Sequence, residues 1–145
     1  TIDFEDWIFN EAFIRCLRTE QTDAVTQIKS DYLANANNQL EFTRQLVSRI
    51  WGTSKKIPHI ALVHLTPLTA LMADDLFSSW EKRGVVFVKA GPALNDSFYS
   101  EDTTFVGPVG KTFVWQAKET RRLQGPDLKA PDSLRERTSS LCTSP

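Results

Sequence analysis

The stretch that decides the predicted fold is residues 102–116, Asp-Thr-Thr-Phe-Val-Gly-Pro-Val-Gly-Lys-Thr-Phe-Val-Trp-Gln. Apolar and β-branched residues flank a turn that begins and ends with glycine, so the pattern predicts a strand over residues 98–106 and a second strand over residues 111–118. Side chains alternate between the two faces of a strand. Gln116 and Lys118 therefore share one face, and the hairpin can bring Asp102 close to both.

The segment before this hairpin predicts a strand, a helix and another strand. Residues 60–65 form a short, mostly apolar run that is typical of a buried strand. Thr66 and Pro67 together are a strong helix start, and this helix is predicted to stop at Gly84. Residues 85–89, Val-Val-Phe-Val-Lys, then predict the next strand.

Two acidic residues, Asp74 and Asp75, lie in this predicted helix. Asp75 borders the apolar side, three and four residues from Met72 and Leu71, whereas Asp74 is turned further out. A carboxylate beside an apolar face is uncommon without a partner. A metal ion or Lys118 could be that partner, and the alternative is an ordinary surface acid.

The first half of the chain predicts three helices. The first runs over residues 4–18 with Asp3 as its cap, and the second covers residues 22–34. The asparagine-rich residues 35–38 are expected to separate the second helix from a third, which ends at Trp51 before Gly52. Such aromatic helices suit a buried position or an interface.

This order of elements predicts an α/β or α+β fold, in which a helical N-terminal part packs on a small mixed sheet. At 145 residues, we expect one domain over residues 1–123, with a helical part (1–52) and a sheet-containing part (57–123). Residues 124–145 are polar and punctuated by prolines. We expect them to form an arm or linker with a short helix around residues 132–137.

Composition and net charge argue against some classes of nucleic-acid-binding and membrane proteins. The formal net charge is −1, which argues against a non-specific coat for nucleic acid but less against a nuclease, whose metal site is itself acidic. No apolar run is long enough to span a bilayer, and no segment resembles a signal peptide. Because the chain begins at Thr1, we expect it to be a domain of a longer protein.

The cysteines and histidines give weaker signals. Cys16 and Cys142 lie at opposite ends of the chain and do not form a disulfide framework, so a reducing, intracellular location in the cytoplasm or nucleus is expected. His59 and His64 lie on or beside the first predicted strand. For His64, a hydrogen-bonded position in the core is favoured over a role as a catalytic base.

One family resemblance emerges from these segments. The run from Asp75 to Gly84, the strand after it, Asp102 and the Gln116-Ala-Lys118 sequence together resemble the core of the PD-(D/E)XK nucleases, and most closely the Mrr-like restriction endonucleases. The resemblance covers residues 66–118. It implies a restriction-endonuclease-like core in which Asp102, Gln116 and Lys118 are catalytic, and Asp74, Asp75 and Asp102 are candidate ligands of Mg²⁺.

The reaction implied by this resemblance is metal-assisted hydrolysis of phosphodiester bonds by an endonuclease. The metal would lower the pKa of a bound water, and Lys118 would orient that water or stabilise the transition state. Gln116 stands where the family carries a charged ligand, and a proline-rich tail follows Lys118 in place of the family's last helix and strand. These differences favour an alternative, a non-catalytic interaction or assembly module.

The two alternatives imply different partners. A nuclease would bind nucleic acid, whereas an assembly module would use its aromatic helices and its C-terminal arm to bind another protein or a second copy of itself. A protein partner or a homo-oligomer is expected in either case. No association with a membrane is expected.

Overall fold

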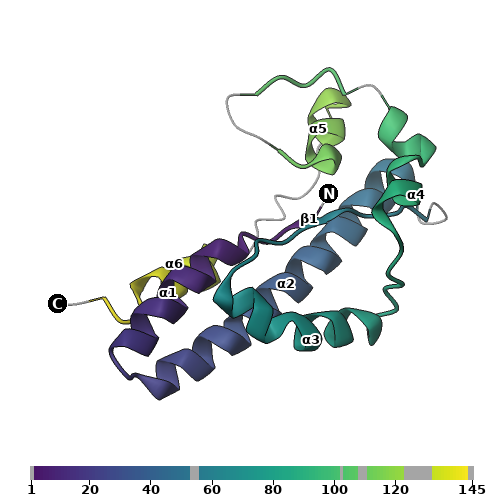
Figure 1. The fold of residues 1–145 in the computed structure, drawn as a ribbon. Helices are drawn as coiled ribbons and strands as arrows, with labels where there is room; N and C mark the ends of the chain where they lie inside the picture. Colours follow the sequence, from purple (N-terminus) through teal and green to yellow (C-terminus); the bar gives the residue numbers. More distant parts are fainter. Residues whose placement is uncertain (1, 53–55, 102, 108–110, 123–131, 144–145) are drawn as a thin grey trace. The chain divides into compact units, whose positions relative to one another are not determined.

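The computed structural model describes residues 2–52, 56–101, 103–107, 111–122 and 132–143 (Figure 1). These residues are mostly helical and include one parallel sheet of two short strands, so the fold is of a mixed α and β type. The chain divides into two compact units. We call residues 1–3, 40–62 and 87–128 unit 1, and residues 4–39, 63–86 and 129–145 unit 2.

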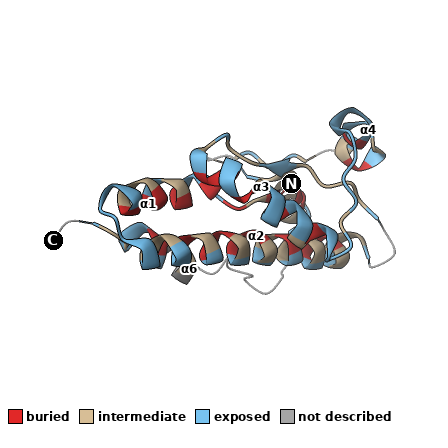
Figure 2. Ribbon diagram, turned by 60° about the horizontal axis from the view of Figure 1, so that its bottom comes forward, coloured by how far each residue is buried: buried red, intermediate tan, exposed pale blue. Residues whose placement is uncertain are grey.

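The first helix, α1 (Asp6–Arg18), belongs to unit 2 and starts two residues later than the sequence predicts. Its N-cap is Glu5 with a φ of 51°, and no side chain caps the helix. The expected cap by Asp3 is therefore wrong. The buried positions of α1 recur at helical spacing and face the first part of α2 (Figure 2); they are Ile8, Phe9, Ala12, Phe13 and Cys16.

The second helix, α2 (Thr22–Trp51), is continuous, so the predicted break at residues 35–38 is wrong. Tertiary contacts explain why the asparagines do not end the helix. Asn35 donates to the backbone oxygen of Phe4 at 2.6 Å, and Asn37 accepts from the hydroxyl of Ser79 at 3.1 Å. Partners outside the helix satisfy these amides, which removes their competition with the helical backbone.

The helix α3 (Pro67–Glu81) confirms the sequence prediction closely. Thr66 is the N-cap, its side chain accepts from the backbone N–H of Thr69, and Pro67 occupies the first turn. Gly84 follows the helix with a φ of 77°, a conformation that suits glycine. The buried face consists of Leu68, Thr69, Met72, Leu76 and Trp80.

The sheet is much smaller than the sequence predicts. It consists of β1 (Ile2–Asp3) and β2 (Ala61–Leu62), which pair in parallel within unit 1. The second strand falls within the predicted run 60–65, but both of its residues are exposed rather than buried. Residues 85–89 do not form a strand. Their apolar character alone does not suffice, because a strand is stabilised by pairing with a neighbour.

The predicted hairpin is wrong over its described residues. Its first strand is replaced by a 3₁₀ turn, η1 (Ser97–Ser100), which follows a short helix, α4 (Ala90–Leu94). Its second strand is replaced by the helix α5 (Phe113–Thr120). Val114 and Ala117 are the buried residues of α5, and their spacing of three matches the period of a helix rather than that of a strand.

The core of unit 1 is rich in aromatic side chains. The ring of Phe98 is fully buried and makes edge contacts with Trp51 at 4.8 Å and Phe113 at 5.0 Å between centroids. Leu46, Val47 and Val114 complete the buried cluster. The last two turns of α2 therefore hold η1 and α5 in place.

The described C-terminal helix, α6 (Asp132–Ser140), extends the short helix predicted around residues 132–137. It packs against α1 within unit 2. Cys16 and Cys142 form a disulfide, a bond that the prediction of no disulfide framework did not include. The two cysteines are 126 residues apart, so no local sequence pattern indicates that they pair. The predicted boundary at residue 123 lies outside the described residues.

The helices of the described residues differ in length from 5 residues in α4 to 30 in α2. None of their helices combines the length and the apolar character that crossing a membrane requires.

Candidate functional site

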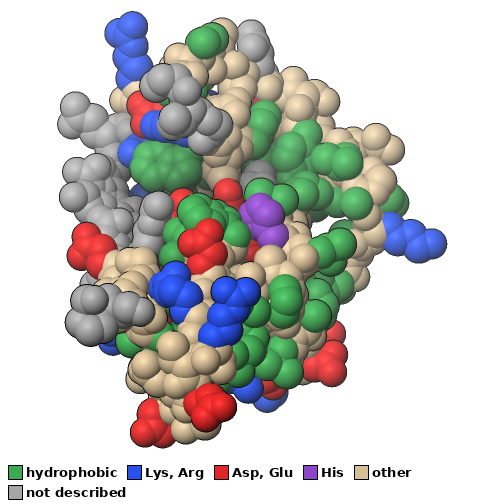
Figure 3. All heavy atoms as spheres, turned by 60° about the vertical axis from the view of Figure 1, so that its left-hand side comes forward, with side chains coloured by type: hydrophobic (Ala, Val, Ile, Leu, Met, Phe, Trp, Pro, Cys, Tyr) green, Lys and Arg blue, Asp and Glu red, His purple; other side chains and the backbone are tan. Residues whose placement is uncertain are grey.

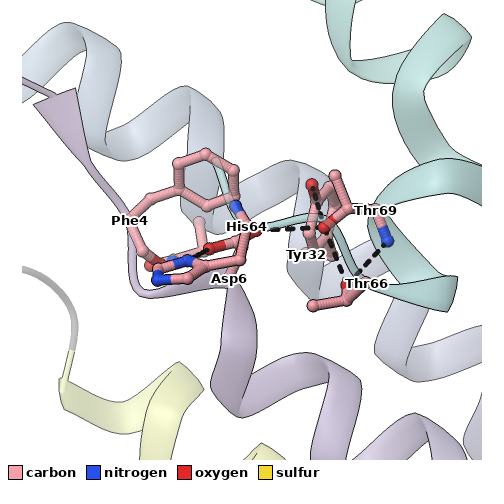
Figure 4. Close-up of polar contacts among 7 residues, drawn as sticks. Phe4, Asp6, Tyr32, His64, Thr66 and Thr69 are labelled. Carbon is pink, nitrogen blue, oxygen red and sulfur yellow. Dashed lines mark hydrogen bonds and ion pairs between the residues drawn. The ribbon is translucent and has the colours of Figure 1, made fainter. Parts of the chain in front are cut away.

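The candidate site of unit 2 is built around the carboxylate of Asp6, the first residue of α1 (Figure 4). Its side chain is fully buried, yet it accepts three hydrogen bonds from two residues. A buried carboxylate is costly unless donors replace its lost water. The three donors, together with the N-terminal end of α1, supply that compensation.

His64 is fixed to Asp6 in two ways. Its ring Nδ1 lies 2.5 Å from Oδ1 of Asp6, and its backbone N–H donates to Oδ2 at 2.8 Å. The side chain is 43% exposed while that of Asp6 is 0% exposed. The predicted hydrogen-bonded histidine is thus confirmed, but the predicted core position is wrong, since the ring lies partly at the surface.

Three hydroxyl groups extend this network behind the carboxylate. Thr69 donates to Oδ2 of Asp6 at 3.0 Å and accepts from the hydroxyl of Thr66 at 3.0 Å. Tyr32 also donates to Thr69, at 3.5 Å. Burial raises the pKa of Tyr32, the hydrogen bond to Thr69 opposes this, and the negative charge of Asp6 raises the pKa further. The phenol therefore stays a donor.

The N-terminal end of α3 lies beside this network but does not offer an anion site. Pro67 has no N–H, the N–H of Leu68 donates to the side chain of Asn10 at 3.2 Å, and that of Thr69 donates to Thr66. These donors are already used inside the protein. What the site offers chemically is therefore the histidine held by a buried carboxylate.

The predicted residues Gln116 and Lys118 lie on α5, in unit 1. Gln116 accepts from Thr103 at 3.0 Å and donates to the backbone oxygen of Lys111 at 2.8 Å. The ammonium of Lys118 lies 4.3 Å from the centre of the Trp115 ring. The two side chains therefore engage different partners, and the expected shared strand face is wrong.

The structure describes two of the three predicted acidic ligands of the metal ion. Asp74 and Asp75 are exposed residues of α3, in unit 2, and Asp102 lies outside the described residues. Within the described part of the chain, no group of three or more His, Cys, Asp or Glu side chains is arranged to hold a metal ion. The metal prediction for Asp102 remains a prediction.

The second histidine, His59, differs from His64 in its surroundings. Burial, with a smaller contribution from nearby positive charge that includes Arg44, lowers the pKa of His59 from 6.5 to about 4. The imidazole is therefore neutral at pH 7 and its charged form is disfavoured. His64, in contrast, is held by the carboxylate of Asp6.

Sequence reasoning missed Asp6 entirely. Asp6 stands in an aromatic segment that predicts a helix, and 58 positions separate it from His64. The signal that points towards the site is the Thr66-Pro67 helix start, which fixes where the loop carrying His64 ends. No family model, curated protein or solved structure matches the chain.

Proposed function

We propose that the protein is a hydrolase in which His64 acts as the general base and Asp6 orients it. The observation that carries this proposal is the double attachment of His64 to one buried carboxylate, through the ring at 2.5 Å and through the backbone at 2.8 Å. A base that is held in one orientation and reaches the surface is suited to proton transfer.

The carboxylate selects the tautomer of the ring. Nδ1 of His64 donates its hydrogen to Asp6, so Nε2 is the atom that takes a proton from the nucleophile. When Nε2 is protonated, the ring becomes a cation beside the negative charge of Asp6. That charge stabilises the cation as it forms, as in other carboxylate–histidine pairs.

The nucleophile is a water molecule in this proposal. Thr66 and Thr69 are hydroxyl-bearing neighbours, but both hydroxyls belong to the network that ends on Asp6. Water loses one proton to His64 as its oxygen attacks the substrate, and His64 returns that proton to the leaving group.

Phosphodiester bonds are the first substrate class to test, because the PD-(D/E)XK resemblance implies them. Mg²⁺ is included in the assay for the same reason, because the resemblance implies this ion. In this form the nuclease hypothesis no longer depends on a hairpin, since the base is His64 rather than Lys118.

The decisive experiment compares the wild-type chain with His64→Gln and Asp6→Asn. Cleavage of plasmid and single-stranded DNA is measured with Mg²⁺ and with Mn²⁺, and p-nitrophenyl esters serve as a second substrate class. We expect His64→Gln to lower the rate by about 10²- to 10⁴-fold, because proton transfer is lost. Asp6→Asn should lower it as well, since an amide cannot balance the charge on the ring.

His59→Gln is the matched control, because it removes the other histidine. It should fold and retain the wild-type rate. Circular dichroism of each variant separates a lost base from a lost fold. Equal rates in wild type and in a folded His64→Gln variant would overturn the proposal, and so would an absence of turnover on every substrate.

A second candidate function, a protein-interaction module, is favoured by one observation. Unit 2 exposes several large apolar side chains: Leu65 is fully exposed, Leu71 is 54% exposed, and Trp7 and Phe77 are less so. Figure 3 shows hydrophobic side chains at the surface among charged ones. A surface of this kind can bind another protein. Sedimentation velocity of wild type and Leu71→Lys tests it, because a loss of self-association in the variant would support an interface.

The disulfide changes the proposed location. The intracellular expectation depended on cysteines that do not pair, whereas Cys16 and Cys142 are joined. We therefore propose that the protein works in an oxidising compartment. Alkylation of thiols at the moment of cell lysis, followed by mass spectrometry of the intact protein, checks this, and an alkylated pair of cysteines would contradict it.

A further inference from the structure

We propose that α6 is a redox-controlled clasp, which the Cys16–Cys142 disulfide holds against α1 and which reduction releases. The disulfide lies just beyond the end of α6 and joins it to a fully buried residue of α1. This inference concerns a different part of unit 2 from the Asp6–His64 pair and does not depend on the proposed hydrolysis.

The first contact that seats α6 is at its C-terminal end. Arg15 of α1 donates to the backbone oxygen of Ser139 at 2.8 Å and to that of Leu141 at 3.3 Å. A guanidinium at this end satisfies carbonyl groups that lack helical partners and complements the helix dipole. Arg15 therefore positions the end of α6 beside Cys16, the next residue of α1.

The second contact is an ion pair. Both carboxylate oxygens of Asp31, in α2, accept from the guanidinium of Arg137, and the Nε contact measures 3.2 Å. Asp31 is buried, with a side chain that is 4% exposed, whereas Arg137 is 53% exposed. Gln27 also donates to Asp31, at 2.8 Å. Release of α6 would thus return a buried carboxylate to water.

Two features weaken the seat once the disulfide is gone. Thr138 is fully buried, and its hydroxyl is without a hydrogen-bond partner among the described residues. Cys142 has a φ of 55°, in the left-handed region that residues other than glycine adopt uncommonly. Among the described residues, the contacts of Arg15 and Arg137 are the side-chain polar links that then hold this short polar helix, and we infer that the covalent bond is its main restraint.

The reduction step requires a dithiol as the co-reactant. Its thiolate attacks Sγ of Cys142, because Cys142 is partly exposed while Cys16 is fully buried. The sulfur–sulfur bond breaks, and Cys16 leaves as a thiolate and takes up a proton. The second thiol of the reductant then closes the reductant's own disulfide and frees Cys142. Two electrons and two protons pass to the protein.

Hydrogen exchange of the full chain tests the clasp. Exchange is followed by mass spectrometry in the oxidised protein, in the protein reduced with dithiothreitol, and in Cys142→Ser. We expect amides of residues 134–141 to exchange about tenfold faster or more in the reduced protein and in the variant. Amides of α1, α2 and α3 should exchange no faster than global unfolding of the same sample allows, whereas those of residues 134–141 should open at a lower free energy than that limit.

Cys142→Ser with added dithiothreitol is the matched control and should show no further change. Unchanged protection of residues 134–141 after reduction would overturn the proposal. An equal loss of protection at residues 134–141 and throughout α1, α2 and α3 would overturn it too, because the disulfide would then support the whole unit rather than hold one helix.

Discussion

At the scale of single residues, the buried hydroxyl of Thr138 is expected to destabilise the folded state. Its side chain is fully buried on α6, without a hydrogen-bond partner among the described residues. A hydroxyl that loses its water without gaining a partner destabilises the folded state. Valine has nearly the same shape and no hydroxyl.

We therefore expect Thr138→Val to raise the free energy of unfolding by up to about 1 kcal/mol. Urea denaturation of the oxidised protein measures this change. Thr138→Ser is the matched variant, because it keeps the hydroxyl and loses the methyl group, and it should be less stable than wild type. A Val variant that is less stable than wild type would show that the hydroxyl has a partner in solution.

His59 gives a prediction about pH. Burial lowers its pKa from 6.5 to about 4, so between these values the unfolded chain binds a proton that the folded chain does not. The free energy of unfolding should therefore fall as pH falls from 6.5 to 4, by up to about 3 kcal/mol for this one group. Urea midpoints across that range measure the fall, and His59→Gln should reduce it. An identical pH dependence in the two proteins would contradict the prediction.

At the scale of elements, α2 depends on side chains that appear unsuited to a helix. Asn35 is buried within it and donates to the backbone oxygen of Phe4 at 2.6 Å. Asn35→Ala would leave that oxygen without this donor, although alanine is the better helix former. We expect a loss of about 1–3 kcal/mol in the free energy of unfolding.

Asn38→Ala is the control for this prediction, because Asn38 is an exposed residue of the same helix. It should change the stability by no more than about 0.5 kcal/mol. Thermal unfolding followed by circular dichroism compares the two variants. Equal effects would mean that helix propensity, rather than the contact with Phe4, governs the stability of α2.

The elements also show what could be predicted from the sequence. The start of α3 is encoded locally, by the Thr66 cap and by Pro67. The hairpin prediction failed because the apolar residues of this segment also fit a helix, in which Val114 and Ala117 are buried at a spacing of three. For α2, the residues of the two predicted helices are helical but form one continuous helix, in which contacts outside the helix satisfy the amides of Asn35 and Asn37.

The candidate site was beyond such local reasoning. The Asp6–His64 pair joins residues 58 positions apart, and the disulfide joins residues 126 positions apart. Neither pair forms a sequence motif, because the residues around each partner indicate only the local secondary structure. The packing of α1, α3 and α6 brings the partners of both pairs together, and this packing is known only from the three-dimensional structure.

For the whole molecule, the disulfide restricts the unfolded chain. Closing a loop of this length lowers the entropy of the unfolded state, so reduction should lower the free energy of unfolding by about 3–5 kcal/mol. Urea denaturation with and without dithiothreitol measures the difference. The variant Cys142→Ser should match the reduced protein and should not respond to the reductant. A midpoint that does not move on reduction would contradict this.

The bond between Cys16 and Cys142 also gives the chain a ring topology, since nearly every residue lies between the two sulfur atoms. A protease that cuts one peptide bond inside this ring opens it but leaves a single covalent molecule. A nicked sample would therefore keep its full mass, apart from one added water, and would separate into two fragments only on a reducing gel.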